Sequence, residues 1–395
     1  MGGLDVDRLR AETPGVEKVL HFNNAGAGLM PGPVLDAVTG HLQLEATHGG
    51  YEAADIARPR LDDTYDAIAG LINCHRDEVA VVENATVAWN QAFYAVAETM
   101  GAGDRILTVE AEYASNFIQY LRLKETRGVE TVIVPSTESG ETDVARMTEL
   151  MDDRVKLISV CHIPTNGGLI NPVAEIGRLA RAADVPYLLD ACQSVGQIPV
   201  DVAEIGCDFL SVTGRKYLRG PRGTGFLYAS RRAMERFTPP VLDLHSARWD
   251  AVDQYTILPG ARRFENWENY EAGKIGLGVA VRYLLDVGMD AASKRLTGLA
   301  ESLRQRLSNL PGIKVRDLGR EKGGIVTFSH AEADLEKLAQ ALRAQHINVS
   351  TTKATSTQID MTRRRLDRMV RASVHYYNTE SEIDRFVDAI GALTR

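Results

Sequence analysis

The sequence predicts an α/β protein, with a mostly parallel sheet covered by helices in a large domain and a smaller α+β domain at the C-terminus. Between about residues 78 and 230, short apolar runs alternate with amphipathic helical patterns. Beyond about residue 275, long helical stretches such as "YLLDVGMDAASKRLTGLAESLRQRLSNL" replace that alternation. We therefore expect an N-terminal segment over 1–20, a large domain over 21–275 and a small domain over 276–395.

The alternation can be followed along the chain, pair by pair. The run "EVAVVENAT" is β-rich and apolar, and "VAWNQAFYAVAETM" after it has helical spacing. The later pairs are "RILTV" with "SNFIQYLRLKETRG", "ETVIV" with "DVARMTELM", "VKLISV" with "NPVAEIGRLARAA", and "PYLLD" with "CDFLSVT". Strands of this kind indicate a parallel sheet covered on both faces, whose carboxyl edge collects ligands. The polar residues that close these runs, and that we expect at this edge, are Thr86, Glu112, Asn166, Asp190 and Thr213.

Composition excludes several classes of protein. The 395 residues carry a net charge of -8, which argues against a surface built to neutralise nucleic-acid phosphates. Four cysteines are scattered without a CxxC pair, so we expect neither a zinc site nor a disulfide framework, and no metal. No apolar run approaches the roughly 18 residues of a membrane span, and the first residues lack the apolar core of a signal peptide. We expect a cytoplasmic protein that binds neither membrane nor nucleic acid.

One lysine stands out because of its position. "LSVTGRKYLRGPRGTGFLY" places Lys216 between an apolar run and a glycine-rich turn, while Asp190 closes the preceding run "PYLLD". A carboxylate and an amine from successive strands can meet at one sheet edge. Pyridoxal phosphate requires that pairing, because its aldehyde forms a Schiff base with a lysine and its ring nitrogen needs a carboxylate to stay protonated. For Lys216 taken alone, a solvated charge in a turn is the alternative.

Two threonines are candidates for binding the phosphate of such a cofactor. Thr86 opens a helix after a strand, where free N–H groups and the positive end of the helix dipole favour an anion. Thr213 supplies a second hydroxyl close to Lys216. Taken singly, Thr86 is also typical of a helix cap and Thr213 of a strand end. Together with Asp190 and Lys216 they form a candidate cofactor site.

Two stretches, "LLDACQSVGQIPVD" and "CDFLSVTGRKYLRGPRGTGFLY", resemble the core of the class V aminotransferase family of fold type I pyridoxal-phosphate enzymes. This group includes cysteine desulfurases, selenocysteine lyases, isopenicillin N epimerase-like proteins and carbon–sulfur lyases. The resemblance extends from "HFNNAGAGLMP" to "VRASVHYYNTESEIDRFVDAI", which is nearly the whole chain. It implies a fold type I large domain, a small C-terminal domain and pyridoxal 5'-phosphate as the cofactor.

The resemblance also implies roles for individual residues. Lys216 matches the Schiff-base lysine, Asp190 the partner of the ring nitrogen, and Gln193 the amide that bonds the ring hydroxyl. Arg371 matches the arginine that holds the substrate carboxylate, and a guanidinium suits that task because it is a planar, two-pronged donor. The other cofactor-binding candidates are Thr86, Ala85, Thr213, Tyr113, Asn166 and Arg215, and the other substrate-binding candidates are Asn166, Asn24, Ala25 and Tyr51.

The chain departs from the desulfurase pattern in three places. Where those relatives have a histidine that stacks on the cofactor, "EYASN" places Tyr113, which can stack but cannot shuttle protons as readily as imidazole. Arg215 replaces the histidine that often precedes the lysine, and either adds a cation near the phosphate or points to solvent. The segment "NVSTTKATSTQIDMTRRRLDRMVRAS" contains no cysteine, although desulfurases take up sulfur as a persulfide there. We therefore do not expect persulfide chemistry by that route.

The remaining reactions diverge after Lys216, as general base, removes the α-proton of an amino acid to give a carbanion. We expect β-elimination at a carbon–sulfur or similar bond first, then transamination, then epimerisation. The order rests on the resemblance to the lyase branch, and Tyr113 is a candidate acid toward the leaving group. A catalytically dead binding protein on the same fold is the alternative that is not an enzyme.

The resemblance further implies a homodimer with active sites shared between the subunits. The segment "RRFENWENYEAG" resembles the part of the family that reaches the cofactor of the partner subunit. Arg263 and Trp267 are the expected contacts within it. An obligate interface of this kind buries more than about 2,000 Å².

Overall fold

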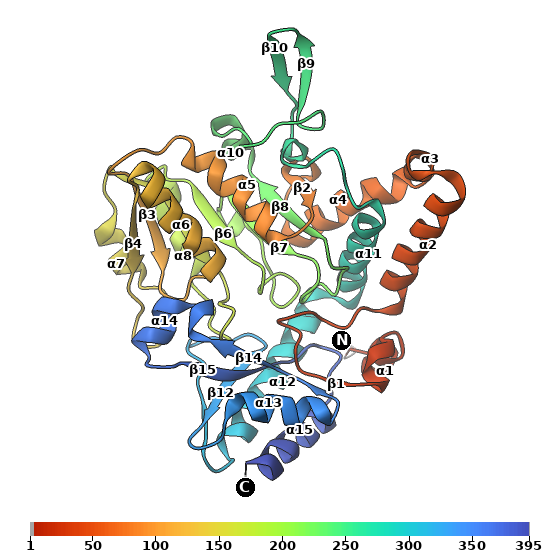
Figure 1. The fold of residues 1–395 in the computed structure, drawn as a ribbon, viewed down its shortest axis with the longest axis vertical. Coiled ribbons are helices and arrows are strands. Elements are labelled where there is room, and N and C mark those ends of the chain that lie inside the picture. The colour runs from red at the N-terminus through yellow and green to blue at the C-terminus, as the bar shows by residue number, and fades with distance from the viewer. Residues whose placement is uncertain (1–3, 395) are drawn as a thin grey trace.

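The structure is a computed structural model that describes residues 4–394. Its largest element is a seven-stranded sheet with the strand order β2-β8-β7-β6-β5-β3-β4 (Figure 1). Strand β8 runs antiparallel to β2 and β7, and the other neighbouring strands are parallel, which confirms the α/β expectation. In sheet order, the strands span Val79–Val82, Gly225–Ala229, Phe209–Thr213, Tyr187–Asp190, Val155–Cys161, Arg105–Val109 and Glu130–Val134.

Helices cover both faces of this sheet, in which most strand residues are apolar and buried. In β2, Val79 and Val81 join one hydrophobic cluster, while Ala80 and Val82 join the cluster on the opposite face. The first face is covered by α4 (Arg58–Ile72), α7 (Val144–Leu150), α8 (Val173–Ala182), α9 (Val202–Ile205) and α11 (Glu271–Val287). The second is covered by α5 (Ala85–Ala97), α6 (Ala114–Arg127) and α10 (Arg231–Arg236).

A second, smaller sheet lies in the C-terminal part and has the order β11-β12-β15-β14, with every pair antiparallel. Its strands are Ile313–Val315, Ile325–His330, Arg368–Ser373 and Ser350–Lys353, and it packs with α12 (Met289–Ser308), α13 (Leu335–Ala344) and α15 (Glu380–Leu393). The N-terminal segment joins this core, because β1 (Leu20–His21) pairs with β13 (Ile347–Asn348) and Phe22 stacks on Phe386 at 4.7 Å. The two ends of the chain therefore share one hydrophobic core.

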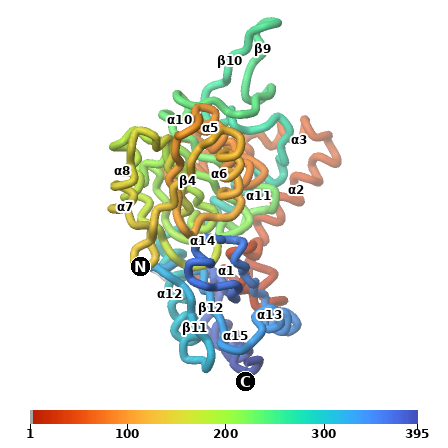
Figure 2. Tube along the Cα trace, turned by 60° about the vertical axis from the view of Figure 1, so that its left-hand side comes forward, coloured from red at the N-terminus to blue at the C-terminus, as the bar shows by residue number. Residues whose placement is uncertain are grey.

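One hairpin projects from this body, and four further helices complete the fold. The hairpin of β9 (Ala247–Ala251) and β10 (Gln254–Ile257) extends away from it in both views (Figures 1 and 2). The remaining helices are α1 (Val6–Ala11), α2 (Gly32–His48), α3 (Gly50–Ile56) and α14 (Gln358–Arg363), with short 3-10 turns at Pro14–Glu17, Arg76–Glu78, Ala261–Phe264 and Ala354–Ser356. Within residues 4–394, no helix combines the length and the apolar character needed to cross a membrane.

Arg219 ties three segments together beneath the glycine-rich turn. Its guanidinium is buried and donates to the Leu29 carbonyl at 2.7 Å, to Tyr376 Oη at 3.1 Å and to Thr13 Oγ1 at 2.5 Å. The cation also lies over the ring of Tyr377, 4.5 Å from its centroid. Its backbone adopts a φ of 60°, which is unusual for a residue with a side chain. The turn that follows Lys216 is therefore held to both the N-terminal segment and the C-terminal part.

Two helical glycines give opposite predictions for stability. A Cβ on Gly177, in α8, would lie 1.7 Å from the Ile205 carbonyl oxygen and 3.5 Å from the Tyr187 ring, whereas a Cβ on Gly298, in α12, meets nothing within 4 Å. Gly177→Ala should lower the free energy of unfolding by about 3 kcal/mol, because α8 must move off the sheet. Gly298→Ala should raise it by about 0.5–1 kcal/mol through helix propensity. Urea unfolding of both variants checks this, and equal effects would contradict the packing.

Candidate active site

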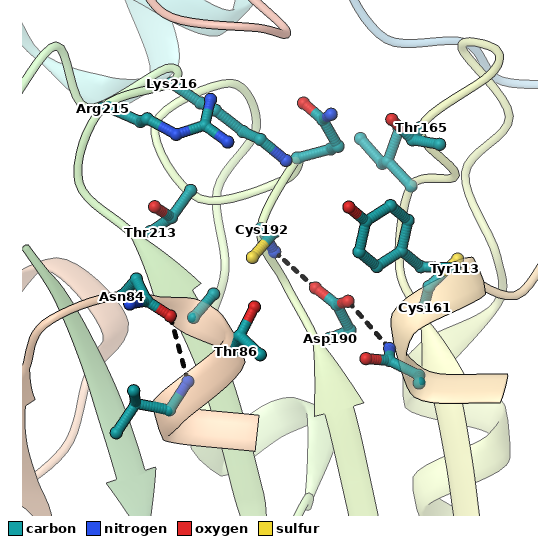
Figure 3. A pocket seen from close by; sticks show the side chains of 15 residues that line it. Asn84, Thr86, Tyr113, Cys161, Thr165, Asp190, Cys192, Thr213, Arg215 and Lys216 are labelled. Carbon is teal, nitrogen blue, oxygen red and sulfur yellow. Dashed lines mark hydrogen bonds between the residues drawn. The ribbon is translucent and has the colours of Figure 1, made fainter. Parts of the chain in front are cut away.

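The carboxyl edge of the large sheet carries a cavity of about 460 Å³. Asp190, Thr213 and Cys161 are the last residues of β6, β7 and β5, so three neighbouring strands end at it. Lys216 comes from the loop after β7 and extends into the same space (Figure 3). The cofactor-binding residues expected from the sequence that line this cavity are Lys216, Asp190, Gln193, Thr86, Ala85, Tyr113, Thr213 and Arg215.

One end of the cavity is suited to an anion. Helix α5 begins there, and the Asn84 side chain caps it by accepting a hydrogen bond from Val87 N at 3.1 Å. Within residues 4–394, the backbone N–H groups of Ala85 and Thr86 have no acceptor, and they lie at the positive end of the helix dipole. Arg215 adds a cation to the same cavity. A phosphate would satisfy these groups together.

Lys216 is half-buried, and burial of its ammonium group in the cavity lowers the pKa of that group. Its side chain makes no hydrogen bond and no ion pair with any residue that the structure describes. The backbone around it is held from two sides, since Arg215 O accepts from Gly28 N at 2.8 Å and Lys216 O accepts from Arg219 N at 3.0 Å. A buried amine without a partner is poised for a covalent bond rather than for an ion pair.

Asp190 also lacks a counter-ion in the described part of the chain. Its Oδ1 accepts from Cys192 N at 3.0 Å and its Oδ2 from Asn116 Nδ2 at 3.1 Å, both neutral donors. Only 9% of the residue is exposed, so the carboxylate is largely removed from water. A buried carboxylate of this kind favours a positively charged group in the cavity beside it.

These unpartnered groups test whether pyridoxal phosphate fits. The Oε1 atom of Gln193 is buried and has no donor among residues 4–394, while its Nε2 donates to the Ala25 carbonyl at 3.2 Å. The amine of Lys216, the carboxylate of Asp190 and this amide oxygen are the partners that the aldehyde, the ring nitrogen and the ring hydroxyl of the cofactor need. The residues present therefore fit the cofactor.

A buried network lies behind Asp190. Asn116 Nδ2 donates both to Asp190 Oδ2 and to Glu112 Oε1, the latter at 2.9 Å, so one amide links two carboxyl groups. Glu112 was expected at this edge from its place in the sequence, whereas Asn116 was missed. Burial, followed by the charge of Asp190, raises the pKa of Glu112 to about 8. Both residues stand in the stretch "EYASN", Glu112 two residues before α6 and Asn116 in its first turn, and that stretch is the signal that could have found Asn116.

Arg371, on β15, contacts the cavity wall through Thr165 but does not itself line the cavity as the structure describes it. Its Nη1 donates to both O and Oγ1 of Thr165 at 3.0 Å, and its Nε donates to Ser350 Oγ at 3.2 Å. All of these acceptors are neutral, and within the described residues no carboxylate pairs with it. Thr165 itself lines the cavity with Lys216 (Figure 3). The cation is thus directed by neutral groups and left available for an anion.

Three of the predicted substrate or cofactor residues lie in the walls. The amide of Asn166 donates to Thr357 Oγ1 at 2.9 Å. Asn24 is buried, donates to the Ser373 carbonyl at 2.8 Å and accepts from Tyr377 Oη at 2.6 Å. Ala25 contributes its carbonyl to Gln193. None of Asn166, Asn24 and Ala25 lines the Lys216 cavity as the structure describes it.

Tyr51, Arg263 and Trp267 lie away from that cavity. Tyr51 and Trp267 line a separate groove of about 1020 Å³, with 77% and 56% of their surfaces exposed. Arg263 is half-buried, and its guanidinium donates to the Gly260 and Met234 carbonyls at 3.1 and 3.2 Å. These residues do not meet Lys216 within one chain.

Two cysteines that were not among the expected site residues line the cavity. Cys192 and Cys161 come from the ends of β6 and β5, beside Asp190 and Lys216 (Figure 3). Burial, and then the charge of Asp190, raises the pKa of the Cys192 thiol, and burial, followed by Glu112, raises that of Cys161. Both side chains are therefore neutral thiols, which are poor nucleophiles.

Comparison with known proteins agrees with this geometry. The family described as aminotransferase class-V matches residues 20–386. A probable cysteine desulfurase of Methanothermobacter thermautotrophicus is 30% identical to the chain, over 95% of the chain and 94% of that protein. These findings confirm the resemblance read from "LLDACQSVGQIPVD" and the motif around Lys216.

Solved structures show the same fold. The apo cysteine desulfurase of Thermococcus onnurineus superposes with a TM-score of 0.92 at 24% identity, covering 100% of this chain and 99% of that one. The cystine C–S lyase C-DES, in complex with its product cysteine persulfide, superposes with a TM-score of 0.86 at 22% identity, covering 96% and 99%. With a family match that spans residues 20–386, this chain belongs to the class-V aminotransferase family.

Proposed function

We propose that this protein is a pyridoxal-phosphate-dependent lyase that cleaves a carbon–sulfur bond of an α-amino acid by β-elimination. The observation that carries the proposal is the cavity in which the unpartnered amine of Lys216 and the carboxylate of Asp190, which has no counter-ion among residues 4–394, lie beside the N-terminus of α5. The relatives named cysteine desulfurase support a reaction at sulfur.

The roles that we propose for Asp190, Lys216 and Arg371 follow from their surroundings. When bound, pyridoxal phosphate takes up the electron pair that remains on the substrate α-carbon after its proton is lost. Asp190 keeps the ring nitrogen protonated, because a buried carboxylate favours a neighbouring cation. Lys216 accepts the α-proton, and its lowered pKa favours the neutral amine that a base requires. Arg371 would hold the substrate carboxylate through Nη2, whose only partner among the described residues is Asn23 Oδ1 at 3.4 Å.

The side-chain sulfur leaves without a covalent carrier on the enzyme. The segment 347–373 contains no cysteine, and it carries Ser350 and Thr357 as partners of Arg371 and Asn166. The thiols of Cys161 and Cys192 stay protonated, which prevents them from attacking sulfur. Tyr113 lies in the cavity with 40% of its surface exposed, where its hydroxyl can protonate the departing sulfur.

The active enzyme is a homodimer in this proposal. The hairpin exposes Trp249, Val252 and Tyr255, with 71%, 92% and 61% of their surfaces in contact with solvent. Exposed apolar groups of this size are typical of surfaces that bind another protein. Tyr51 and Trp267, both exposed, line the groove of about 1020 Å³. The partner would supply the substrate-binding groups that one chain does not bring to Lys216.

The reaction is tested by its products. The cofactor-loaded protein should release pyruvate and a reduced sulfur species from sulfur-bearing amino acids, and Lys216→Ala should slow pyruvate formation by about 10³-fold, because the base is lost. A panel of amino acids is assayed for pyruvate, for the amine form of the cofactor and for racemisation. Amine-form cofactor that needs a keto acid to recover would identify a transaminase and overturn elimination.

The attachment site is tested by reduction of the loaded protein with borohydride. The label should be found on the Lys216 peptide by mass spectrometry, because this buried amine has no partner in the described chain. Lys274 is a matched internal control, since it is also buried but lies 3.4 Å from the Glu265 carboxylate. Labelling of Lys274, or of any lysine in place of Lys216, would contradict the assignment.

The dimer is tested by light scattering after size-exclusion chromatography. The parent chain should have twice the mass of one subunit, and Trp249→Ser combined with Tyr255→Ser should increase the monomer fraction, because both changes remove exposed apolar surface from the hairpin. Leu393→Ser is the control, since it also replaces an exposed apolar residue but lies at the opposite end of the molecule (Figure 1). A parent protein that is monomeric and fully active would refute the proposal.

A further inference from the structure

Two buried carboxyl groups share a single amide beneath the cavity. Asn116 Nδ2 lies 2.9 Å from Glu112 Oε1 and 3.1 Å from Asp190 Oδ2, so each of its two hydrogens serves one carboxyl group. Glu112 is 3% exposed, while Asp190 borders the cavity. The protonation state of Glu112 therefore affects Asp190 through one intervening side chain, that of Asn116.

The surroundings of Glu112 contain no positive charge to balance an ionised carboxylate. The groups that face it are Thr108 of β3 at 3.2 Å, Tyr120 of α6 at 3.5 Å, Asp190 of β6 through Asn116, and Cys161 of β5. Its Oε1 also accepts from Tyr113 N at 2.7 Å. Within residues 4–394, no lysine, arginine or histidine forms an ion pair with it. Two negative charges joined by one neutral amide in a buried site repel each other.

The hydrogen bonds indicate which oxygen would carry a proton. Oε1 already accepts two N–H groups, from Tyr113 and Asn116. Oε2 is near hydroxyl groups alone, those of Thr108 and Tyr120. Tyr120 gives its own hydrogen to Ser159 Oγ at 2.8 Å, so its oxygen is free to accept one. A proton on Oε2 therefore has an acceptor without disturbing Oε1.

We propose that Glu112 carries a proton in the resting enzyme and that, through Asn116, it is a positioning residue that adjusts the charge Asp190 presents to the ring nitrogen of the cofactor. The effect on the cofactor rests on the proposed function, whereas the proton on Glu112 does not require a cofactor. The raised pKa of about 8, caused by burial and then by Asp190, agrees with the geometry. Burial also raises the pKa values of Tyr120 and Cys161, so both stay neutral over the same range.

The coupling has a definite direction. A protonated ring nitrogen beside Asp190 cancels the charge that opposes ionisation of Glu112, so the cofactor should lower the pKa of Glu112. By reciprocity, loss of the Glu112 proton should strengthen the interaction of Asp190 with the charged ring nitrogen. The affinity for the cofactor should then rise with pH through the range in which Glu112 ionises.

The first measurement uses the chain without cofactor. Infrared difference spectroscopy should show the carbonyl band of a protonated carboxyl group at neutral pH, fading as the pH passes about 8, and Glu112→Gln should remove it. Glu141→Gln is the matched control. Glu141 is also buried, and although burial opposes ionisation, hydrogen bonds from Arg320 N and Ser139 lower its pKa to about 2. A spectrum that Glu112→Gln leaves unchanged would overturn the proposal.

Thermal unfolding provides a second readout that is also independent of activity. The raised pKa of Glu112 means that the folded chain binds a proton that the unfolded chain loses near pH 4.5. The contribution to stability is complete below pH 4.5 and is lost as the pH rises to about 8. The Tm of the parent should therefore fall relative to that of Glu112→Gln across this window. A constant difference would contradict the proposal.

The third measurement adds pyridoxal phosphate. Loading should move the loss of the infrared band to lower pH by about one unit, and the visible absorption titration of the bound cofactor should lose one ionisation in Glu112→Gln. Asn116→Ala, which removes the shared amide, should reduce the shift caused by loading. A band that titrates identically with and without cofactor would refute the coupling. A chain that shows the band but binds no cofactor would instead refute the proposed function.

Discussion

The position of Lys216 depends on how Arg219 is buried. A buried guanidinium is costly unless its hydrogens are used, and here a carbonyl, two hydroxyl groups and a tyrosine ring receive it. These partners come from segments distant in sequence, the N-terminal segment with Thr13 and Leu29 and the C-terminal part with Tyr376 and Tyr377. The loop between β7 and β8 is consequently fixed at a point three residues beyond Lys216, so that its amine can remain buried without a partner of its own.

A rigid loop is needed because the empty cavity lowers the stability of the fold. It brings together an amine and an amide oxygen that find no partners in residues 4–394, and a buried carboxylate that has only neutral donors there. Each lowers the stability of the empty fold, and each is satisfied by a different atom of one cofactor. The fold is thus prepared to gain stability from its ligand.

Much of the site could be predicted because the carboxyl ends of parallel strands meet at one edge. That rule placed Asp190, Thr213 and Lys216 together from their positions in the chain alone. The same rule covers Cys161, which ends β5, and Cys192, two residues after β6, but their residue type did not mark them as site residues, and Asn116 lies on α6 rather than at a strand end. Asn24 and Asn166 were assigned to the substrate from the family pattern, while their amides are occupied by wall residues. Side-chain hydrogen bonds of this kind produce no periodic pattern in the sequence.

The pairing of β1 with β13 bears on the order in which the chain can assemble during synthesis. The N-terminal segment emerges from the ribosome first, yet Phe22 stacks on Phe386 and Arg10 pairs with Glu382, near the end of the chain. The large sheet can form while translation continues, but the second core must wait for the last helix. Because Arg219 needs partners from both ends, the lysine loop is completed in this late step. A nascent chain would therefore complete its cofactor site only after Tyr376 and Tyr377 have been synthesised.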